Sequence, residues 1–309
     1  MKLRCGNGEE SASKVNLRKY AVLGLLIACG VSGLRAVPAR ELRARSAVER
    51  LIGASGAEVA VALRTLDGRD ELFIAADQSF HAASTMKIPV MIELFAQVQA
   101  GKVRLDEPLT VKNEFRSIVD ASVYQLDAAD DSDPEVYKAV GQTMTLGRLC
   151  EAMITVSSNL ATNLLIDKLG VENIRRTVHS LHADGMQVRR GVEDGKAFAQ
   201  SINNTTTARA LLILLEAIAK SEAVDPASSH AMVEILKRQK FNEAIPAGLP
   251  AGTPVAHKTG EITKIHHDAA IVYGPRAYVL VILVRGLAEK ERSAALMAEI
   301  TKLVHQDIQ

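Results

Sequence analysis

The sequence predicts an α+β fold: one antiparallel sheet built from both ends of the chain, flanked by helices, with an all-helical lobe inserted between its halves. Strand-like runs gather near the two ends, within 58–76 and 258–286, and the residues between them are mostly helical in pattern. The composition, 48% hydrophobic and 24% charged over 309 residues, is that of an ordinary globular protein.

The first half of the sheet is expected to be a hairpin that follows an amphipathic helix at 41–53. The runs "EVAVALRTL" (58–66) and "ELFIAA" (71–76) are rich in apolar residues and flank Asp67-Gly68, a dipeptide that favours a tight turn. These two runs therefore predict neighbouring antiparallel strands.

The second half of the sheet is expected near the end of the chain. Strands at 269–275 and 277–286 meet at Gly274-Pro275, and a helix at 289–306 closes the chain. The stretches between the two strand groups predict helices at 84–100, 145–154, 160–169, 171–182, 205–220 and 228–238.

The distribution of charge argues against binding to nucleic acid. Residues 1–45 hold nine of the 37 basic and three of the 36 acidic side chains, which leaves 28 basic and 33 acidic ones and a net charge of −5. This mildly acidic body contains no basic run, so we expect no nucleic-acid partner. The acidic stretch "DAADDSDPE" (127–135) lacks the spacing of a calcium loop and is expected to be a solvated surface loop.

The N-terminus has the pattern of a targeting segment. Lys14, Arg18 and Lys19 precede the short apolar stretch 20–34, as in a secretory signal. We therefore expect residues 1–45 to be a leader and residues 46–309 to be a single catalytic domain with two lobes.

Three fates of the leader remain open. Cleavage after Ala39 would release the body, whereas cleavage before Cys29, within "LIAC", would leave a lipid-anchored cysteine as in a bacterial lipoprotein. An uncleaved leader would serve as a single anchor helix. Each fate predicts an exported protein, periplasmic or extracellular, that touches the membrane only through its leader.

Neither the cysteines nor the histidines predict a metal site. Cys150 is the one cysteine outside the leader, so the body can form no internal disulfide, and Cys150 is expected to be a small buried residue. His266 and His267 are adjacent on a strand and point to opposite faces, so together with His257 they do not form a chelating group. We expect neither a metal nor another cofactor.

The stretch "HAASTMKIP" (81–89) places a serine three residues ahead of a lysine at the start of an apolar helix. A buried ammonium is unfavourable, so burial favours the neutral amine of Lys87. On a helix this amine is expected to reach back to the Ser84 hydroxyl and accept its proton, which would make Ser84 a nucleophile.

Two further motifs follow in order along the chain. "VSSNLATN" (156–163) presents Ser157 and Asn159 between two helices, and "HKTGE" (257–261) presents Lys258, Thr259 and Gly260 on an expected sheet edge.

The order S-x-x-K, S-x-N and K-T-G resembles the serine penicillin-recognising enzymes, and most closely the class A β-lactamases. The resemblance extends from about residue 47 to 306 and includes "TTTA" (205–208) at the start of a helix and "HDAAIVYGP" (267–275) on a strand.

The resemblance implies a role for each motif residue. Ser84 would be acylated, Lys87 would accept its proton, and Ser157 would pass a proton to the leaving nitrogen with the help of Lys258. Asn159 would bind the side-chain amide of the substrate, and Lys258 with Thr259 would bind its carboxylate.

The same resemblance implies how the oxyanion is held. The backbone N–H groups of Ser84 and Glu261 would form the oxyanion hole, and Gly260 would permit the close backbone approach that brings them together. Glu261 occupies a position where a small residue is commoner, and it would place a carboxylate near the amide side of the substrate.

Hydrolysis of the acyl-enzyme needs a glutamate that activates water, and Glu193 in "RRGVEDGKAFAQSINNTTT" (189–207) is the candidate. The loop departs from the family pattern, because Arg190 lies three residues ahead instead of two. The fourth residue beyond Glu193 is Ala197 instead of asparagine, and Asn204 stands in place of an aspartate that pairs with the arginine. Asn163 is expected to support this loop.

The motif between the helices also departs from the family, since Ser158 replaces the usual aspartate. Three functions therefore remain open. The first is a monomeric serine β-lactamase that acts on small β-lactam molecules. The second is a D,D-peptidase or penicillin-binding protein that acts on peptidoglycan stem peptides. The third is a β-lactam sensor that deacylates slowly.

Overall fold

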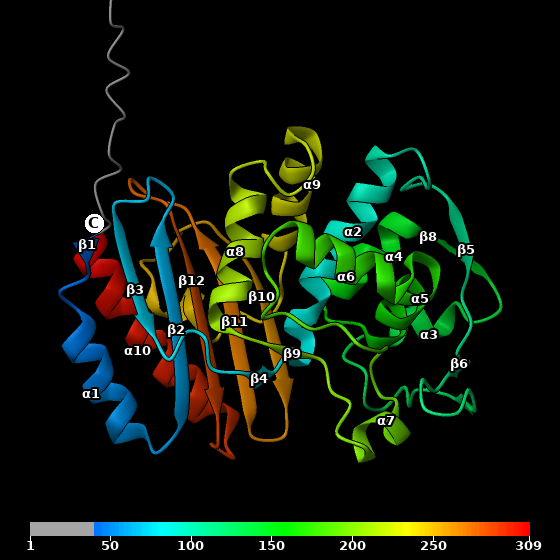
Figure 1. Ribbon diagram of the computed structural model, residues 1–309, viewed down its shortest axis with the longest axis horizontal. Helices are drawn as coiled ribbons and strands as arrows, with labels where there is room; N and C mark the ends of the chain where they lie inside the picture. The colour runs from blue at the N-terminus through cyan, green and yellow to red at the C-terminus, as the bar shows by residue number, and fades with distance from the viewer. Residues whose placement is uncertain (1–39) are drawn as a thin grey trace, which may run out of the picture. The chain divides into compact units, whose positions relative to one another are not determined.

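The computed structural model describes residues 40–309, and residues 1–39 of the predicted leader, including Cys29 and Ala39, lie outside the described part of the chain. The described residues contain a six-stranded sheet with the order β1-β3-β2-β12-β11-β10 (Figure 1). All neighbours in this sheet are antiparallel except the two-residue strand β1 (Arg40–Glu41), which runs parallel to β3.

Both ends of the chain meet in the middle of this sheet, as the sequence predicts. β2 (Glu58–Thr65) and β3 (Asp70–Ile74) form the predicted hairpin, and β12 (Tyr278–Arg285) pairs with β2 so that Leu280 lies opposite Leu63. β11 (Ile265–Val272) follows, and β10 (Val255–Ile262) forms the edge. This edge strand carries the K-T-G motif.

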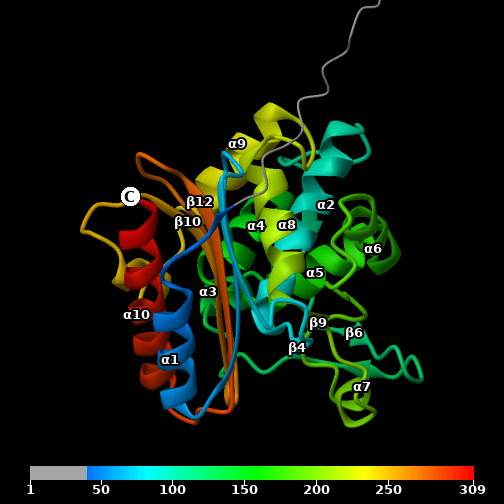
Figure 2. The same ribbon diagram turned by 60° about the vertical axis from the view of Figure 1, so that its left-hand side comes forward.

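Helices cover both faces of the sheet, and the alternation of side chains along the strands explains why (Figure 2). Val61 and Leu63 pack in one hydrophobic core with residues of α10 (Lys290–Ile308), beside which α1 (Arg45–Ser55) lies. Ala60 and Ala62 point the other way, into the core shared with α8 (Ala208–Ala219). Since both faces are buried, the strands read as continuous apolar runs.

The helical lobe is built around α2 (Lys87–Gln99), which is buried on nearly every side and continues from the 3-10 turn η1 (Ala83–Met86). A helix buried all round must be apolar all round, which is why the amine of Lys87 is exceptional there. The other helices of the lobe are α3 (Pro134–Lys138), α4 (Leu146–Thr155), α5 (Asn159–Leu169), α6 (Val171–Ser180), α7 (Gly195–Ala199) and α9 (Pro226–Leu236).

Short elements tie the lobe together. β4 (Phe80–His81) pairs with β9 (Thr205–Thr206), and a 3-10 turn, η2 (Ile245–Gly248), precedes β10. Two further pairs of short strands join β5 (Pro108–Thr110) to β8 (Thr143–Thr145) and β6 (Phe115–Arg116) to β7 (Val123–Tyr124).

The structure corrects several predicted boundaries. The helix expected at 205–220 starts only at Ala208, because Thr206 is a buried partner of Phe80 in a strand and the Thr207 side chain caps the helix by accepting from the Ala210 N–H. The helix expected at 41–53 lies at 45–55, after β1. The helices α3 and α7 were not predicted, although each starts after an aspartate cap.

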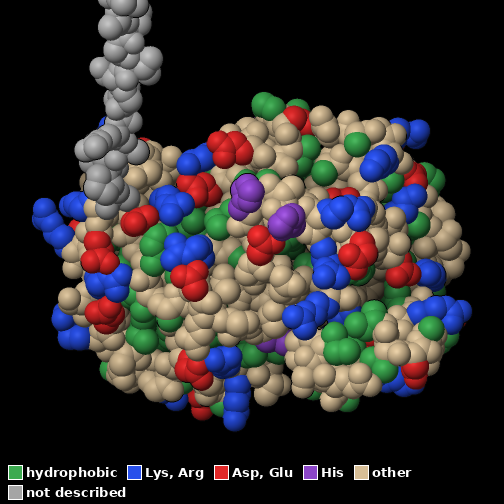
Figure 3. Space-filling model, in the orientation of Figure 1, with side chains coloured by type: hydrophobic (Ala, Val, Ile, Leu, Met, Phe, Trp, Pro, Cys, Tyr) green, Lys and Arg blue, Asp and Glu red, His purple; other side chains and the backbone are tan. Residues whose placement is uncertain are grey.

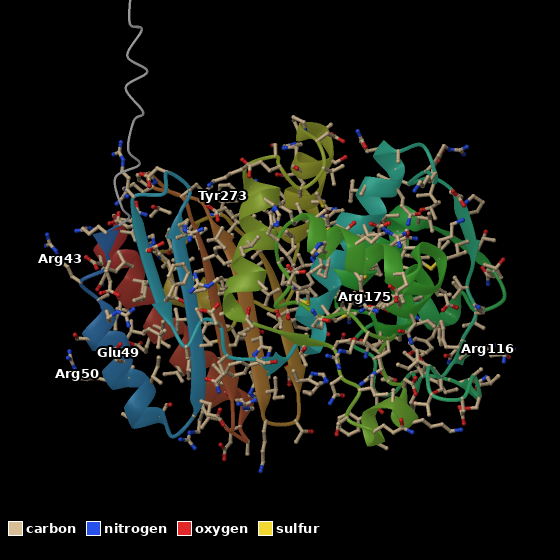
Figure 4. The ribbon with its side chains drawn as sticks, viewed as in Figure 1. Arg43, Glu49, Arg50, Arg116, Arg175 and Tyr273 are labelled. Carbon is tan, nitrogen blue, oxygen red and sulfur yellow. The ribbon has the colours of Figure 1, made fainter. Side chains whose placement is uncertain are left out.

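The surface carries charges of both signs, and the cysteine of the body lies in the core. Basic and acidic side chains are interspersed on the face in Figure 3, and Arg43, Arg50 and Arg116 point away from the body in Figure 4. Cys150 is fully buried, as predicted, and burial raises the pKa of its thiol to about 12. Within residues 40–309, no helix is long and apolar enough to span a bilayer.

Candidate active site

The residues of the three motifs come together where the edge strand β10 faces the helical lobe. Ser84 lies on η1, Ser157 and Asn159 lie at the turn between α4 and α5, and Thr259 lies on β10. These residues line one cavity of about 620 Å³. Lys87 and Lys258 are fully buried, and both amines reach the Ser157 hydroxyl, from α2 and from β10.

Lys87 is held by the turn between α4 and α5. Its amine donates to the backbone oxygen of Ser157 at 2.7 Å and to Oδ1 of Asn159 at 2.8 Å, and it lies 3.2 Å from the Ser157 hydroxyl. Burial lowers the pKa of Lys87 to about 7, although the charges of Asp131 and Glu193 oppose this shift. A neutral amine has two N–H donors, so these two acceptors leave its lone pair for a hydroxyl proton.

The predicted contact between Lys87 and Ser84 is not formed. Among the described residues no hydrogen bond joins the Lys87 amine to the Ser84 hydroxyl, because the amine is drawn to three oxygen atoms on the neighbouring turn. Ser84 also lies in a 3-10 turn, not in the regular α-helix on which the prediction was based.

Ser157 lies between two lysines. Its hydroxyl is 3.2 Å from the Lys87 amine and 3.1 Å from the Lys258 amine, so it can exchange a proton with either. Ser157 has a φ of 61°, in the left-handed region that costs a non-glycine residue about 1–3 kcal/mol. This conformation lets both its hydroxyl and its carbonyl oxygen face Lys87.

Lys258 completes the pair. It donates to the backbone oxygen of Thr259 at 2.8 Å as well as to Ser157. Burial and the nearby positive charge of Lys87 lower its pKa well below the usual range, and the charge of Asp268 opposes this effect. Asp268 is itself buried in a hydrogen bond of 2.9 Å with His257.

Gly260 brings the sheet edge against the serine turn. A Cβ atom at this position would lie 3.2 Å from the Ser84 nitrogen and 3.1 Å from the Thr85 nitrogen, so only glycine allows this approach without displacement. The close approach places the start of η1 beside the strand residue Glu261, where the oxyanion hole was predicted.

Glu193 lies beside the same cluster. Its Oε1 accepts a hydrogen bond of 2.6 Å from Nδ2 of Asn159, the residue that also holds Lys87 through its oxygen. Glu193 as a whole residue is exposed, whereas the desolvation of its carboxyl raises the pKa of that group, and the hydrogen bond from Asn159 opposes this shift. Glu193 has a φ of 60°, which turns the chain sharply at this point.

The loop around Glu193 is supported as the sequence predicts, although its ion pair is missing. Asn163 accepts from the Val192 N–H at 2.7 Å and donates to the Val192 oxygen at 3.0 Å. Asn204 accepts from the N–H of Arg190 at 3.2 Å and donates to its carbonyl at 3.1 Å. Hydrogen bonds of the neutral Asn204 side chain therefore hold the loop at Arg190, where the family has an arginine–aspartate ion pair.

The acidic stretch 127–135 lies mostly on the surface, as predicted, but it is more than a solvated loop. Oδ2 of Asp131 accepts hydrogen bonds from the N–H groups of Asn159 at 2.8 Å and Leu160 at 3.0 Å. The loop therefore packs against the active-site turn, and Asp130 and Ser132 line the cavity. The sequence contains one hint of this contact, because Ser158 stands where the family usually has an aspartate.

Other predicted residues have structural partners. Glu261 forms an ion pair of 2.7 Å with Lys290 at the start of α10. His266 bonds to Ser293, and His267 bonds to the backbone oxygen of His81. Within the described part of the chain, no group of three or more His, Cys, Asp or Glu residues is placed to hold a metal ion.

This combination of fold and site defines a serine enzyme of the penicillin-recognising type. Residues 43–308 match the profile of the beta-lactamase enzyme family, and the chain belongs to that family. Beta-lactamase 1 of Bacillus cereus is 28% identical over 220 residues, which cover 69% of this chain and 71% of that protein.

Solved structures agree with this assignment. An ancestral class A β-lactamase superposes with a TM-score of 0.73 at 28% identity, covering 85% of this chain and 98% of that one. A mutant of PBP-A, solved as an acyl-enzyme complex with penicillin G, superposes with a TM-score of 0.75 at 28% identity, covering 87% and 98%. The predicted fold class and family are thus confirmed.

The burial of Lys87 predicts a cost in stability. Because its pKa is about 7 in the folded protein and 10.5 for an unperturbed lysine, the unfolded chain binds more protons between these values, and stability at pH 7 is lower than at pH 10. We expect Lys87→Met to raise the free energy of unfolding at pH 7 by about 1–4 kcal/mol, because the desolvation penalty of the ammonium, several kcal/mol, is removed and only its hydrogen bonds to Ser157 and Asn159 are lost.

Urea denaturation at pH 7 and pH 9.5 measures this effect. The gain should shrink at the higher pH, and Lys102→Met, at an exposed lysine, should change little at either. A Lys87→Met protein that is less stable than the wild type at pH 7 contradicts the electrostatic account.

Proposed function

We propose that the protein is a serine β-lactamase of the class A type, which hydrolyses β-lactam antibiotics through an acyl-enzyme on Ser84. One observation carries this proposal beyond family membership. Asn159 holds Lys87 with one end of its amide and Glu193 with the other, at 2.8 and 2.6 Å. A proton acceptor for acylation and a carboxylate for deacylation are thus fixed relative to each other.

Acylation starts with the attack of the Ser84 hydroxyl oxygen on the lactam carbonyl carbon. The neutral Lys87 amine takes the serine proton when the substrate draws the groups together, since such contacts are often long without substrate. The carbonyl oxygen becomes an oxyanion, and the N–H groups of Ser84 and Glu261 stabilise it.

The lactam C–N bond then breaks, and the nitrogen needs a proton. The Ser157 hydroxyl supplies it and recovers a proton from Lys87, which lies 3.2 Å away. Lys258 and Thr259 hold the carboxylate of the substrate through charge and hydrogen bonds. Asn159 has a second amide N–H left for the substrate's side-chain amide.

Deacylation requires a water molecule that attacks the Ser84 ester. The Glu193 carboxylate accepts a proton from this water, and its raised pKa makes it a stronger base than a free glutamate. The tetrahedral intermediate collapses, the bond between the carbonyl carbon and the Ser84 oxygen breaks, and the proton taken by Glu193 passes to the Ser84 oxygen. No metal or other cofactor enters these steps.

A second function has a specific observation in its favour. PBP-A superposes with a TM-score of 0.74 at 27% identity, and the Glu193 loop departs in spacing from the family pattern. A D,D-peptidase or penicillin-binding protein would use the same acylation residues on a peptidoglycan stem peptide and would release a penicilloyl group slowly, as would a sensor. Since the site is complete within one chain, we propose that a monomer is active in either case.

Glu193 separates these functions. With a penicillin, the wild type should turn over without accumulating acyl-enzyme, whereas Glu193→Gln should be acylated and should release product about 10²–10⁴ times more slowly, the usual effect of losing a general base. The measurement is a burst assay with intact-mass detection on residues 40–309, and Ser84→Ala is the control that should not be labelled.

Equal accumulation in the wild type and in Glu193→Gln would make Glu193 a bystander and favour the penicillin-binding function. Label that remains on Ser84→Ala, or that maps to Ser157, would overturn the assignment of the nucleophile.

Gly260 provides a test of the oxyanion hole. Gly260→Ala should push β10 away from η1 by a few tenths of an ångström, since its Cβ would lie 3.2 Å from the Ser84 nitrogen. We expect the acylation rate to fall about tenfold or more, because a shift of 1 Å can cost about 10² in rate. Stopped-flow acylation measures it, and Gly53→Ala, where a Cβ meets no atom within 4 Å, is the control.

We also propose that the protein is exported, which the charged and apolar segments at 14–34 support. Expression of the full chain in a bacterium, followed by fractionation and mass analysis of the mature N-terminus, tests this. A start after Ala39 indicates a secretory signal, and a lipid-modified start at Cys29 that is lost in Cys29→Ser indicates an anchor. A full-length chain in the cytoplasm would refute export.

A further inference from the structure

We propose that Asp131 is a positioning residue for acyl transfer: from a separate loop, its carboxylate holds the turn that carries Ser157 and Asn159, at the position where Ser158 replaces an aspartate. The inference rests on the proposed function in so far as it concerns the reaction. The contact itself does not depend on that function.

The geometry joins two segments that are 28 residues apart in the sequence. Oδ2 of Asp131 accepts hydrogen bonds from the N–H groups of Asn159 and Leu160 at 2.8 and 3.0 Å and lies 3.3 Å from the Ser158 hydroxyl. The first N–H groups of a helix have no partner within the helix, and a carboxylate there is stabilised by the helix dipole. Asp131 therefore caps α5 from outside.

Ser158 provides the cap from within the helix. Its hydroxyl accepts from the Ala161 N–H at 3.3 Å, so it satisfies a donor that Asp131 does not reach. Ser158 is fully buried and uncharged. The negative charge that the motif lacks is therefore supplied by the loop, while the serine keeps the local cap.

The loop is attached on both sides of the turn. The Ser132 hydroxyl donates to the backbone oxygen of Val156, just ahead of Ser157, while Asp131 binds just behind it. Ser157 between them has the unfavourable φ of 61°. A strained conformation persists only where its surroundings hold it, and these contacts supply that restraint.

The turn held in this way carries the groups that move protons. The carbonyl and hydroxyl oxygens of Ser157 and Oδ1 of Asn159 surround the Lys87 amine, and Nδ2 of Asn159 holds Glu193. A displacement of the turn would therefore move the acceptors of Lys87 and the support of Glu193 together.

The charge of Asp131 acts on the same groups. It raises the pKa of Lys87 against the effect of burial, and it raises the pKa of Glu193. Glu193, from the loop before α7, also raises the pKa of Lys87, and Lys258, from β10, faces it across the Ser157 hydroxyl. Removal of the Asp131 charge should lower the pKa of Lys87 further and make its amine a weaker base.

The test compares Asp131→Asn and Asp131→Ala with the wild type in acylation of Ser84 by a penicillin between pH 5 and 9. We expect Asp131→Asn to lower the rate at its plateau about tenfold and to shift the acid limb to lower pH. Asp131→Ala should lose more, because it also removes the hydrogen-bond acceptor. A purely structural role of Asp131 would lower the acylation rate without moving the acid limb of the pH–rate profile.

Two further variants sharpen the test. The double variant Asp131→Asn/Ser158→Asp moves the carboxylate to position 158 of the motif. It should recover both the acylation rate and the position of the acid limb of the pH–rate profile. Asp127→Asn removes an exposed charge from the same loop and should leave both unchanged. If penicillin acylates the wild type, and Asp131→Asn shows the same acylation rate and the same acid limb of the pH–rate profile, the proposed role is overturned.

Hydrogen exchange gives a readout that needs no β-lactam. The amides of Asn159 and Leu160 should exchange faster in Asp131→Ala than in the wild type, and unchanged exchange there would refute the contact. A wild type that penicillin does not acylate would refute the proposed function alone, because faster exchange in the variant would still establish that Asp131 holds the turn.

Discussion

The amine of Lys87 is the constraint on which the active site depends. An amine on a helix that is buried on nearly every side must be neutral or fully hydrogen-bonded, and it is stabilised by oxygen atoms of Ser157 and Asn159. These acceptors belong to the turn between α4 and α5. The packing of α2 against α4 and α5 is therefore also what lowers the pKa of a proton acceptor towards neutrality.

The sheet supplies the opposite wall, and its topology makes that wall rigid. β10 is an edge strand, so one side of its backbone is free to face the lobe, and its other side is paired along its whole length with β11. Lys258 comes from this strand to the hydroxyl that Lys87 also approaches. Ser157 thus joins two walls that belong to distant parts of the sequence.

The sequence predicted the parts of this architecture that leave a local pattern. Apolar runs gave the strands of both chain ends, and the three motifs located Ser84, Ser157 and Lys258, which do come together. The sequence did not predict the contacts that a residue forms with a partner far away in the chain. The Lys87 amine prefers the turn over Ser84, Thr206 joins a strand because Phe80 lies opposite it, and Asp131 reads as one of several loop carboxylates. None of these partners lies nearby in the sequence.

The Glu193 loop shows the same principle at the point where the motif spacing looked wrong. The spacing of the motif matters only because it places the residues that fix the loop. Here the loop is fixed by Asn163, which binds Val192 before Glu193, and by Asp194 after it. Asp194 accepts from the Ile118 N–H and the Ser117 hydroxyl, so it fixes the loop to the β6–β7 segment. With both neighbours held and φ at 60°, the Glu193 carboxylate is directed to Asn159. A loop with a different spacing can therefore present the same carboxylate, because the residues on both sides of Glu193 are tethered.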